Sequence, residues 1–237
     1  MLQLIEYTRF ILVIFIQLPI SAIFIYITCK VLKRRRDRVS YSHCAFSILI
    51  SLTFILNAIS FICRVNSLIC ILQVTILFLT LLSLIFLVIF NLNILRSESD
   101  FHLKTQILII LFYLIGILFI LLIPGGITIN EQTNWKLKCS WFFTIIVVLY
   151  IICFILIPTT ILSLRIYHQF KIEKLKKRWK LSCIGLSGFI FAIIGRLFYN
   201  TWNTSIYKYI WLFLSLLILP SVILIYLGIG KSLRIQQ

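Results

Sequence analysis

Hydrophobic residues in this chain occur in long, nearly continuous runs that are separated by short polar segments. A run of ~20 apolar residues is what an α-helix needs to cross ~30 Å of hydrocarbon at ~1.5 Å per residue. The runs do not alternate between apolar and polar positions, so they do not fit the strands of a membrane β-barrel. We therefore predict seven transmembrane helices over residues 10–32, 42–63, 67–95, 105–123, 141–164, 181–199 and 209–229.

The composition indicates the same class of protein. Apolar residues make up 62% of the chain and charged residues only 12%, and the mean hydropathy is +1.11. This leaves too little polar surface to cover a soluble domain of 237 residues. We predict an all-α fold, a polytopic seven-transmembrane-helix bundle in the lipid bilayer, with residues 1–237 forming a single domain.

Lysine and arginine are unevenly divided between the two sets of loops, and this predicts the orientation. The loops after the first, third and fifth predicted helices, together with the tail, contain Lys30, Lys33, Arg34, Arg35, Arg36, Arg38, Arg96, Lys104, Arg165, Lys171, Lys174, Lys176, Lys177, Arg178, Lys180, Lys231 and Arg234. The opposite set contains Arg9, Arg64, Lys136, Lys138 and Lys208. Because basic loops are retained in the cytoplasm, we expect the N-terminus outside and the C-terminus in the cytoplasm. The membrane we expect is the plasma membrane. The net charge of +17 then reflects topology and attraction to the anionic inner leaflet, not binding to nucleic acid.

The chain has few side chains that suit catalysis or cofactor binding. Every acid lies in a loop or at a terminus: Glu6, Asp37, Glu98, Asp100, Glu131 and Glu173. His43, His102 and His168 lie at predicted cytoplasmic helix ends and lack the spacing of metal ligands. The last predicted helix has no lysine for a retinal Schiff base. We expect no enzyme activity, no metal and no cofactor.

Arg196 is the one lysine, arginine, aspartate or glutamate of a predicted span that does not lie at the cytoplasmic end of its helix; it is close to the outer end. Two interpretations are open: the side chain extends to the lipid headgroups, or it faces an outer cavity. In the second case a small ligand with a carboxylate or phosphate would balance its charge, and Gln73, Tyr199 and Trp211 would complete the ligand-binding cavity.

The third cytoplasmic loop, "RIYHQFKIEKLKKRWK", combines basic residues with apolar residues three and four positions apart. This pattern predicts an amphipathic extension of the fifth helix. The extension either lies against anionic headgroups or docks a cytoplasmic partner. The residues we expect at a docking face are Lys171, Lys174, Leu175, Lys177, Arg178 and Trp179.

With this topology, Cys63, Cys70 and Cys139 lie on the outer, oxidising side. Cys70 begins the third predicted helix and Cys139 precedes the fifth. This arrangement resembles the rhodopsin-like G-protein-coupled receptors, and most closely the divergent serpentine chemoreceptors of nematodes. The resemblance implies a Cys70–Cys139 disulfide, whereas pairing of Cys139 with Cys63, or no pairing, would count against it.

Two proline–tyrosine pairs add to the resemblance. Pro158 and Tyr167 in "IPTTILSLRIYHQF" are similar to the proline and tyrosine of the fifth receptor helix, and Pro220 and Tyr226 in "LPSVILIY" are similar to those of the seventh. The resemblance implies that these positions take part in switching.

We therefore expect a receptor that binds a small extracellular ligand and signals through its basic third cytoplasmic loop to a heterotrimeric G protein. One alternative is a small seven-helix solute carrier of the SWEET type, which the phenylalanine–proline echo between "FIQLP" and "FILIP" favours. A second alternative is a membrane scaffold that does not signal.

Overall fold

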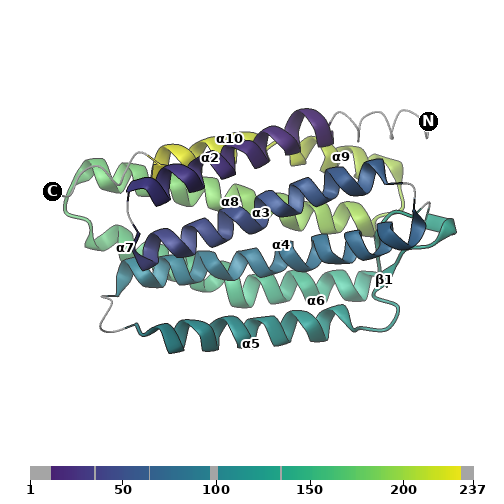
Figure 1. The fold of residues 1–237 in the computed structure, drawn as a ribbon, viewed down its shortest axis with the longest axis horizontal. Helices are drawn as coiled ribbons and strands as arrows, with labels where there is room; N and C mark the ends of the chain where they lie inside the picture. Colours follow the sequence, from purple (N-terminus) through teal and green to yellow (C-terminus); the bar gives the residue numbers. More distant parts are fainter. Residues whose placement is uncertain (1–11, 35, 64, 97–100, 134, 231–237) are drawn as a thin grey trace.

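The computed structural model describes residues 12–34, 36–63, 65–96, 101–133 and 135–230, and shows an elongated bundle of roughly parallel and antiparallel helices (Figure 1). Several charged residues named above lie outside the described residues: Glu6, Arg9, Arg35, Arg64, Glu98, Asp100, Lys231 and Arg234. The elements in chain order are η1 (Leu12–Gln17), α2 (Leu18–Arg34), α3 (Arg38–Ile62), α4 (Asn66–Leu95), α5 (Leu103–Leu121), β1 (Ile127–Thr128), η2 (Glu131–Thr133), β2 (Lys138–Cys139), α6 (Trp141–Ile151), η3 (Ile152–Leu156), α7 (Ile157–Gln169), α8 (Glu173–Thr201), α9 (Ser205–Ser215), α10 (Ile218–Ile225) and η4 (Tyr226–Gly230).

The all-α prediction is confirmed, and within the described residues six helical segments are long and apolar enough to cross a membrane. They agree with the first six predicted spans to within a few residues, except that α8 begins at Glu173 rather than at 181. The seventh predicted span, 209–229, is interrupted by a turn at 216–217 that separates α9 from α10. The chain is therefore an integral membrane protein by the length and composition of these helices.

Three prolines account for the irregular helical geometry at η1, at η3 and between α9 and α10, whereas no proline follows η4. Pro19 and Pro158 each follow a π-helical segment, η1 and η3, and Pro220 follows the turn at 216–217. Proline lacks the N–H that would bond to the carbonyl four residues earlier, and its ring clashes with that carbonyl. The preceding turn therefore widens or breaks, which explains why the last apolar segment is not one continuous helix.

Small residues allow α8 to pack closely against α10 and η4. A Cβ atom added at Gly185 would lie 2.6 Å from the carbonyl oxygen of Ser221, and one added at Gly228 would lie 2.6 Å from the Cβ of Ser182. Close approach through small residues is typical of helices that pack inside membranes. The broken seventh segment is thus held along α8 by backbone-to-backbone contact.

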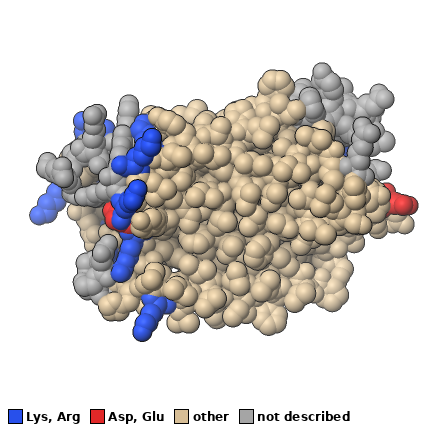
Figure 2. Space-filling model, in the orientation of Figure 1, with Lys and Arg blue, Asp and Glu red and all other residues tan. Residues whose placement is uncertain are grey.

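The two ends of the bundle differ in charge and in structure. We call the end where α2, α4 and α7 finish the basic end, because lysine and arginine side chains gather there (Figure 2). At the opposite end, which we call the hairpin end, β1 and β2 form a two-stranded antiparallel hairpin that pairs Ile127 with Cys139. Between them, the rings of Phe24, Phe46 and Phe189 meet edge-on with centroids 5.7–5.9 Å apart and join α2, α3 and α8.

Candidate functional site

Arg196 lies on α8 near the hairpin end, and its guanidinium points into the bundle. Its Nη2 donates a hydrogen bond to Oδ1 of Asn57 on α3 over 3.2 Å, and Nδ2 of Asn57 donates to Oε1 of Gln17 over 2.6 Å. Asn57 is only 4% exposed. A charge-assisted bond to a buried amide contributes ~1.5–3 kcal/mol net of hydration, so this geometry favours the inward-facing interpretation over extension to the headgroups.

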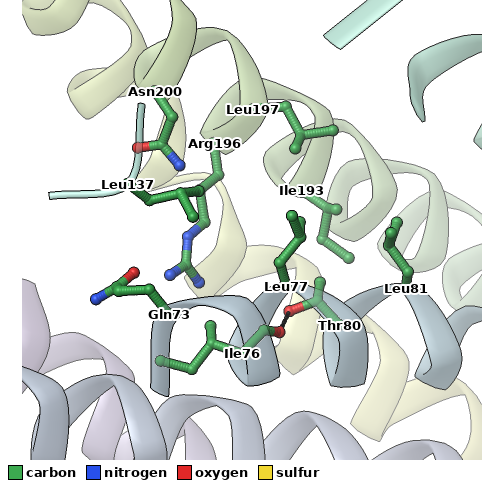
Figure 3. A pocket seen from close by; sticks show the side chains of 10 residues that line it. All are labelled: Gln73, Ile76, Leu77, Thr80, Leu81, Leu137, Ile193, Arg196, Leu197 and Asn200. Atoms are coloured by element: carbon green, nitrogen blue, oxygen red, sulfur yellow. Dashed lines mark hydrogen bonds between the residues drawn. The ribbon is translucent and has the colours of Figure 1, made fainter. Parts of the chain in front are cut away.

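Arg196 and Gln73 line the same small cavity between α4 and α8 (Figure 3). The remaining walls come from both helices and from the hairpin: Ile76, Leu77, Thr80, Leu81, Leu137, Ile193, Leu197 and Asn200. Gln73 is buried and donates from Nε2 to Oγ of Ser60 over 3.0 Å, which fixes its position. The cavity volume is about 20 Å³, which is room for one water molecule and for no organic ligand.

Three lysines lie close together at the hairpin end. Lys136 and Lys138 flank the cavity-lining Leu137 in the hairpin, and Lys208 lies in the first turn of α9. Burial, followed by the positive charges of Lys136 and Lys138, lowers the pKa of Lys208. That shift indicates that the three ammonium groups are near one another, so the hairpin end carries a local positive potential.

Tyr199 and Trp211, the other two predicted ligand contacts, do not line the cavity. The Trp211 ring stacks on Phe198 with centroids 5.5 Å apart and covers Gly195. It belongs to an aromatic cluster with Trp141, Phe198, Trp202 and Tyr207. Tryptophan and tyrosine gather at membrane–water interfaces, so the cluster indicates the level of a headgroup region. Tyr199 is half-buried on the same helix.

The structure does not support the expected Cys70–Cys139 disulfide: both residues are free thiols in it. Cys70 Sγ lies 3.8 Å from the carbonyl oxygen of Ile129, while Cys139 is buried under the hairpin. Burial raises the pKa of the Cys139 thiol to about 12, and the nearby charge of Arg196 partly offsets this. The hairpin ladder and the buried Cys139 side chain hold the loop without a covalent link.

The basic segment differs from the prediction in two respects. The fifth helix does not extend through it: α7 ends at Gln169, and the segment forms the first turns of α8, where Glu173 lies favourably at the positive end of the helix dipole. Furthermore, Leu175 and Trp179 are 9% and 7% exposed, so they pack against the bundle and are not part of a docking face.

Trp179 is held by several contacts. Its Nε1 donates to the carbonyl oxygen of Ser163 over 3.0 Å, and its ring lies 6.4 Å from Phe90 and 6.0 Å from Phe170. These contacts tie the first turns of α8 to α4 and α7. On the outside of the same segment, Lys171, Lys174 and Lys177 are exposed and Arg178 is half-buried.

The predicted switch positions lie at irregular points of the bundle. Pro158 follows η3, and Pro220 follows the turn between α9 and α10. The Tyr226 hydroxyl accepts a hydrogen bond from Nζ of Lys30 over 3.0 Å, which joins η4 to α2. The Tyr167 ring lies 5.9 Å from Nζ of Lys176 and 5.7 Å from the His168 ring. The structure does not bring the two tyrosines together.

Reasoning from the sequence missed the amides around Arg196. Gln17, Asn57 and Asn200 are polar residues in or next to predicted spans, and such residues usually face the bundle interior, so this signal was available. Among the described residues, no group of three His, Cys, Asp or Glu side chains is arranged to hold a metal ion.

Comparison of this chain with protein-family models, with curated proteins and with solved structures finds no match.

Proposed function

We propose that this protein is a membrane receptor of the G-protein-coupled type that binds a small anionic ligand at the hairpin end. The observation that carries the proposal is the position of Arg196. Its guanidinium lines a cavity between α4 and α8, below a hairpin with Lys136 and Lys138 on either side of the cavity-lining Leu137. No acidic side chain lines the described part of this cavity, so the site favours a carboxylate or a phosphate.

The size of the cavity supports a mechanism in which binding moves helices. Sites for small organic ligands usually have volumes of ~300–1,000 Å³, whereas this cavity has about 20 Å³. A ligand that reaches Arg196 must therefore separate α8 from α4. It would bind the open arrangement better than the closed one, and this difference in affinity is what shifts a two-state equilibrium.

Helix α8 is suited to carry that movement along the bundle. Arg196 and Trp179 lie on this one continuous helix, 17 residues or ~26 Å apart. Trp179 packs on Phe90 of α4 and bonds to Ser163 of α7. Displacement of α8 at Arg196 would strain this packing and re-orient the exposed Lys174 and Lys177, to which we assign contact with a heterotrimeric G protein.

The proposal is tested by measuring nucleotide exchange on G proteins in membranes that contain the receptor, during exposure to a panel of small carboxylates and phosphates. For an agonist found in this way, Arg196→Gln should raise the half-maximal concentration by about 10- to 100-fold, as loss of a charged hydrogen bond of ~1.5–3 kcal/mol predicts. Arg196→Lys, which keeps the positive charge, should raise the half-maximal concentration by a smaller factor. Lys104→Gln, which removes an exposed cation from the basic end, is the matched control and should respond like the wild type.

If Arg196→Gln responded at wild-type concentrations, Arg196 would not be the ligand contact. If neutralising Lys174 and Lys177 together left nucleotide exchange intact, the proposed partner surface would be wrong.

A small solute carrier is the second candidate, and one observation favours it. Pro19 and Pro158 lie at matching places in the first and fifth predicted spans, and both follow π-helical segments. Matching irregular helices in two halves of a chain are typical of transporters. Uptake of labelled sugar into liposomes that contain the purified protein and no partner would support the carrier.

A further inference from the structure

A second, larger hollow lies between α7 and α8, in the half of the bundle nearer the basic end. Its volume is about 370 Å³, within the range of small-ligand sites. Residues that line it include Leu156, Thr160, Leu164, Lys180, Ser187 and Ile190. We call this hollow the α7–α8 crevice.

The crevice opens sideways, towards the surface that faces lipid. Thr160 and Leu164 on α7, and Lys180 and Ser187 on α8, line it and are all exposed. Both helices belong to segments that are apolar and long enough to span a membrane. Molecules of the surrounding bilayer therefore have direct access to the crevice from its exposed side.

The charge in the lining of the crevice is at one end. Lys180 is the charged lining residue and lies nearest the basic end of the bundle, while the deeper part is lined by Leu156, Leu186 and Ile190 together with the hydroxyl side chains of Thr159, Thr160 and Ser187. From Lys180 to Ile190 is ten residues along α8, a rise of ~15 Å. This is half of the ~30 Å hydrocarbon core, which is the depth of one leaflet.

We propose that the α7–α8 crevice binds an anionic phospholipid from the leaflet at the basic end, with its phosphate beside Lys180 and an acyl chain along Leu164, Leu186 and Ile190. The lysines and arginines that gather at this end attract anionic lipids to the same leaflet (Figure 2). The inference does not depend on the receptor proposal, because it needs only the bilayer, the crevice and Lys180.

Native mass spectrometry tests the proposal. The protein is reconstituted in bilayers with equal amounts of phosphatidylcholine and phosphatidylglycerol and then transferred to mild detergent, and the retained lipids are counted. We expect one retained lipid, predominantly phosphatidylglycerol. Lys180→Gln should lower the ratio of phosphatidylglycerol to phosphatidylcholine about fivefold. Lys104→Gln, which removes an exposed lysine of the basic end that does not line the crevice, should leave the ratio unchanged.

A filling variant tests the position of the acyl chain. Ser187→Phe places a ring in the crevice and should abolish retention of either lipid. Ile184→Phe enlarges an exposed residue outside the crevice, three positions earlier on α8, and should retain the lipid. Both changes are at exposed positions, so the bundle should fold, and circular dichroism checks that it does.

Fluorescence quenching gives an independent measurement, because Trp179 lines the crevice while Trp135, Trp141, Trp202 and Trp211 lie at or near the hairpin end. Phosphatidylglycerol with brominated chains should quench Trp179 in the wild type and much less in Ser187→Phe. Equal quenching in both, equal retention of the two lipids by the wild type, or retention of a free fatty acid but of no phospholipid would each overturn the proposal.

Discussion

The bond between Arg196 and Asn57 joins α8 to α3 and gives the most direct test of the site. We consider Asn57→Leu, which replaces the buried amide with an apolar side chain of similar size. The change removes the acceptor for Nη2 of Arg196 at 3.2 Å and the donor to Oε1 of Gln17 at 2.6 Å. It leaves the guanidinium in the same place with one fewer acceptor.

The magnitude follows from the two bonds. A neutral hydrogen bond between membrane helices contributes ~0.6 kcal/mol on average, and a bond to a charged group contributes ~1.5–3 kcal/mol. We therefore expect Asn57→Leu to lower the free energy of unfolding by ~2–3.5 kcal/mol. Thr53→Val is the matched control: Thr53 lies one turn away, is as buried, and its hydroxyl bonds only to the carbonyl of Leu49 in its own helix. Its cost should stay below ~1 kcal/mol.

A double-mutant cycle isolates the bond itself. Unfolding in sodium dodecyl sulfate from bicelles is followed by tryptophan fluorescence for Asn57→Leu, for Arg196→Met and for the double variant. We expect a coupling energy of ~1.5–2 kcal/mol, because the charged bond is lost only once in the double variant. A coupling energy below ~0.5 kcal/mol would mean that Arg196 extends to the headgroups and that the inward geometry does not hold.

Three further predictions concern packing and exposure. Gly185→Ala should destabilise the protein by ~1–3 kcal/mol in the same unfolding assay, because its Cβ would lie 2.6 Å from the backbone oxygen of Ser221. Maleimide should label Cys139 far more slowly than the less buried Cys63 at pH 7, and equal labelling rates would contradict the buried position. The labelling rate of Cys139 should rise about tenfold per pH unit up to its pKa of about 12, because only the thiolate reacts. Trp179→Phe should cost ~0.5–1.5 kcal/mol in thermal unfolding, because it removes one hydrogen bond, and no loss would mean that this bond is not formed.

Most of the fold was accessible from the sequence, because a membrane span is a local property. A helix must satisfy its own backbone hydrogen bonds in hydrocarbon and must be long enough to cross it, and both requirements appear as a run of ~20 apolar residues. The runs at 67–95 and 105–123 match α4 and α5 to within two residues. Interruptions were less predictable: Pro220 is visible in the sequence, but proline can either kink a helix or break it, and the break at 216–217 was seen only in the structure.

The direction in which a side chain points was decided by the tertiary structure. In the sequence Arg196 is a charge near a helix end, and its inward direction becomes visible only through contacts such as the bond to Asn57, 139 residues earlier. The amphipathic pattern that includes Leu175 and Trp179 is present in α8, but its apolar side chains pack inside the bundle. The indole of Trp179 lies against Phe90 of α4 and donates to the carbonyl oxygen of Ser163 on α7. The α7–α8 crevice is likewise formed by residues of two helices that no pattern in the sequence connects. The membrane spans and the charge distribution are set by the local sequence, so they can be recognised without a structure. A site depends on contacts between distant segments, and those contacts exist only once the helices have packed.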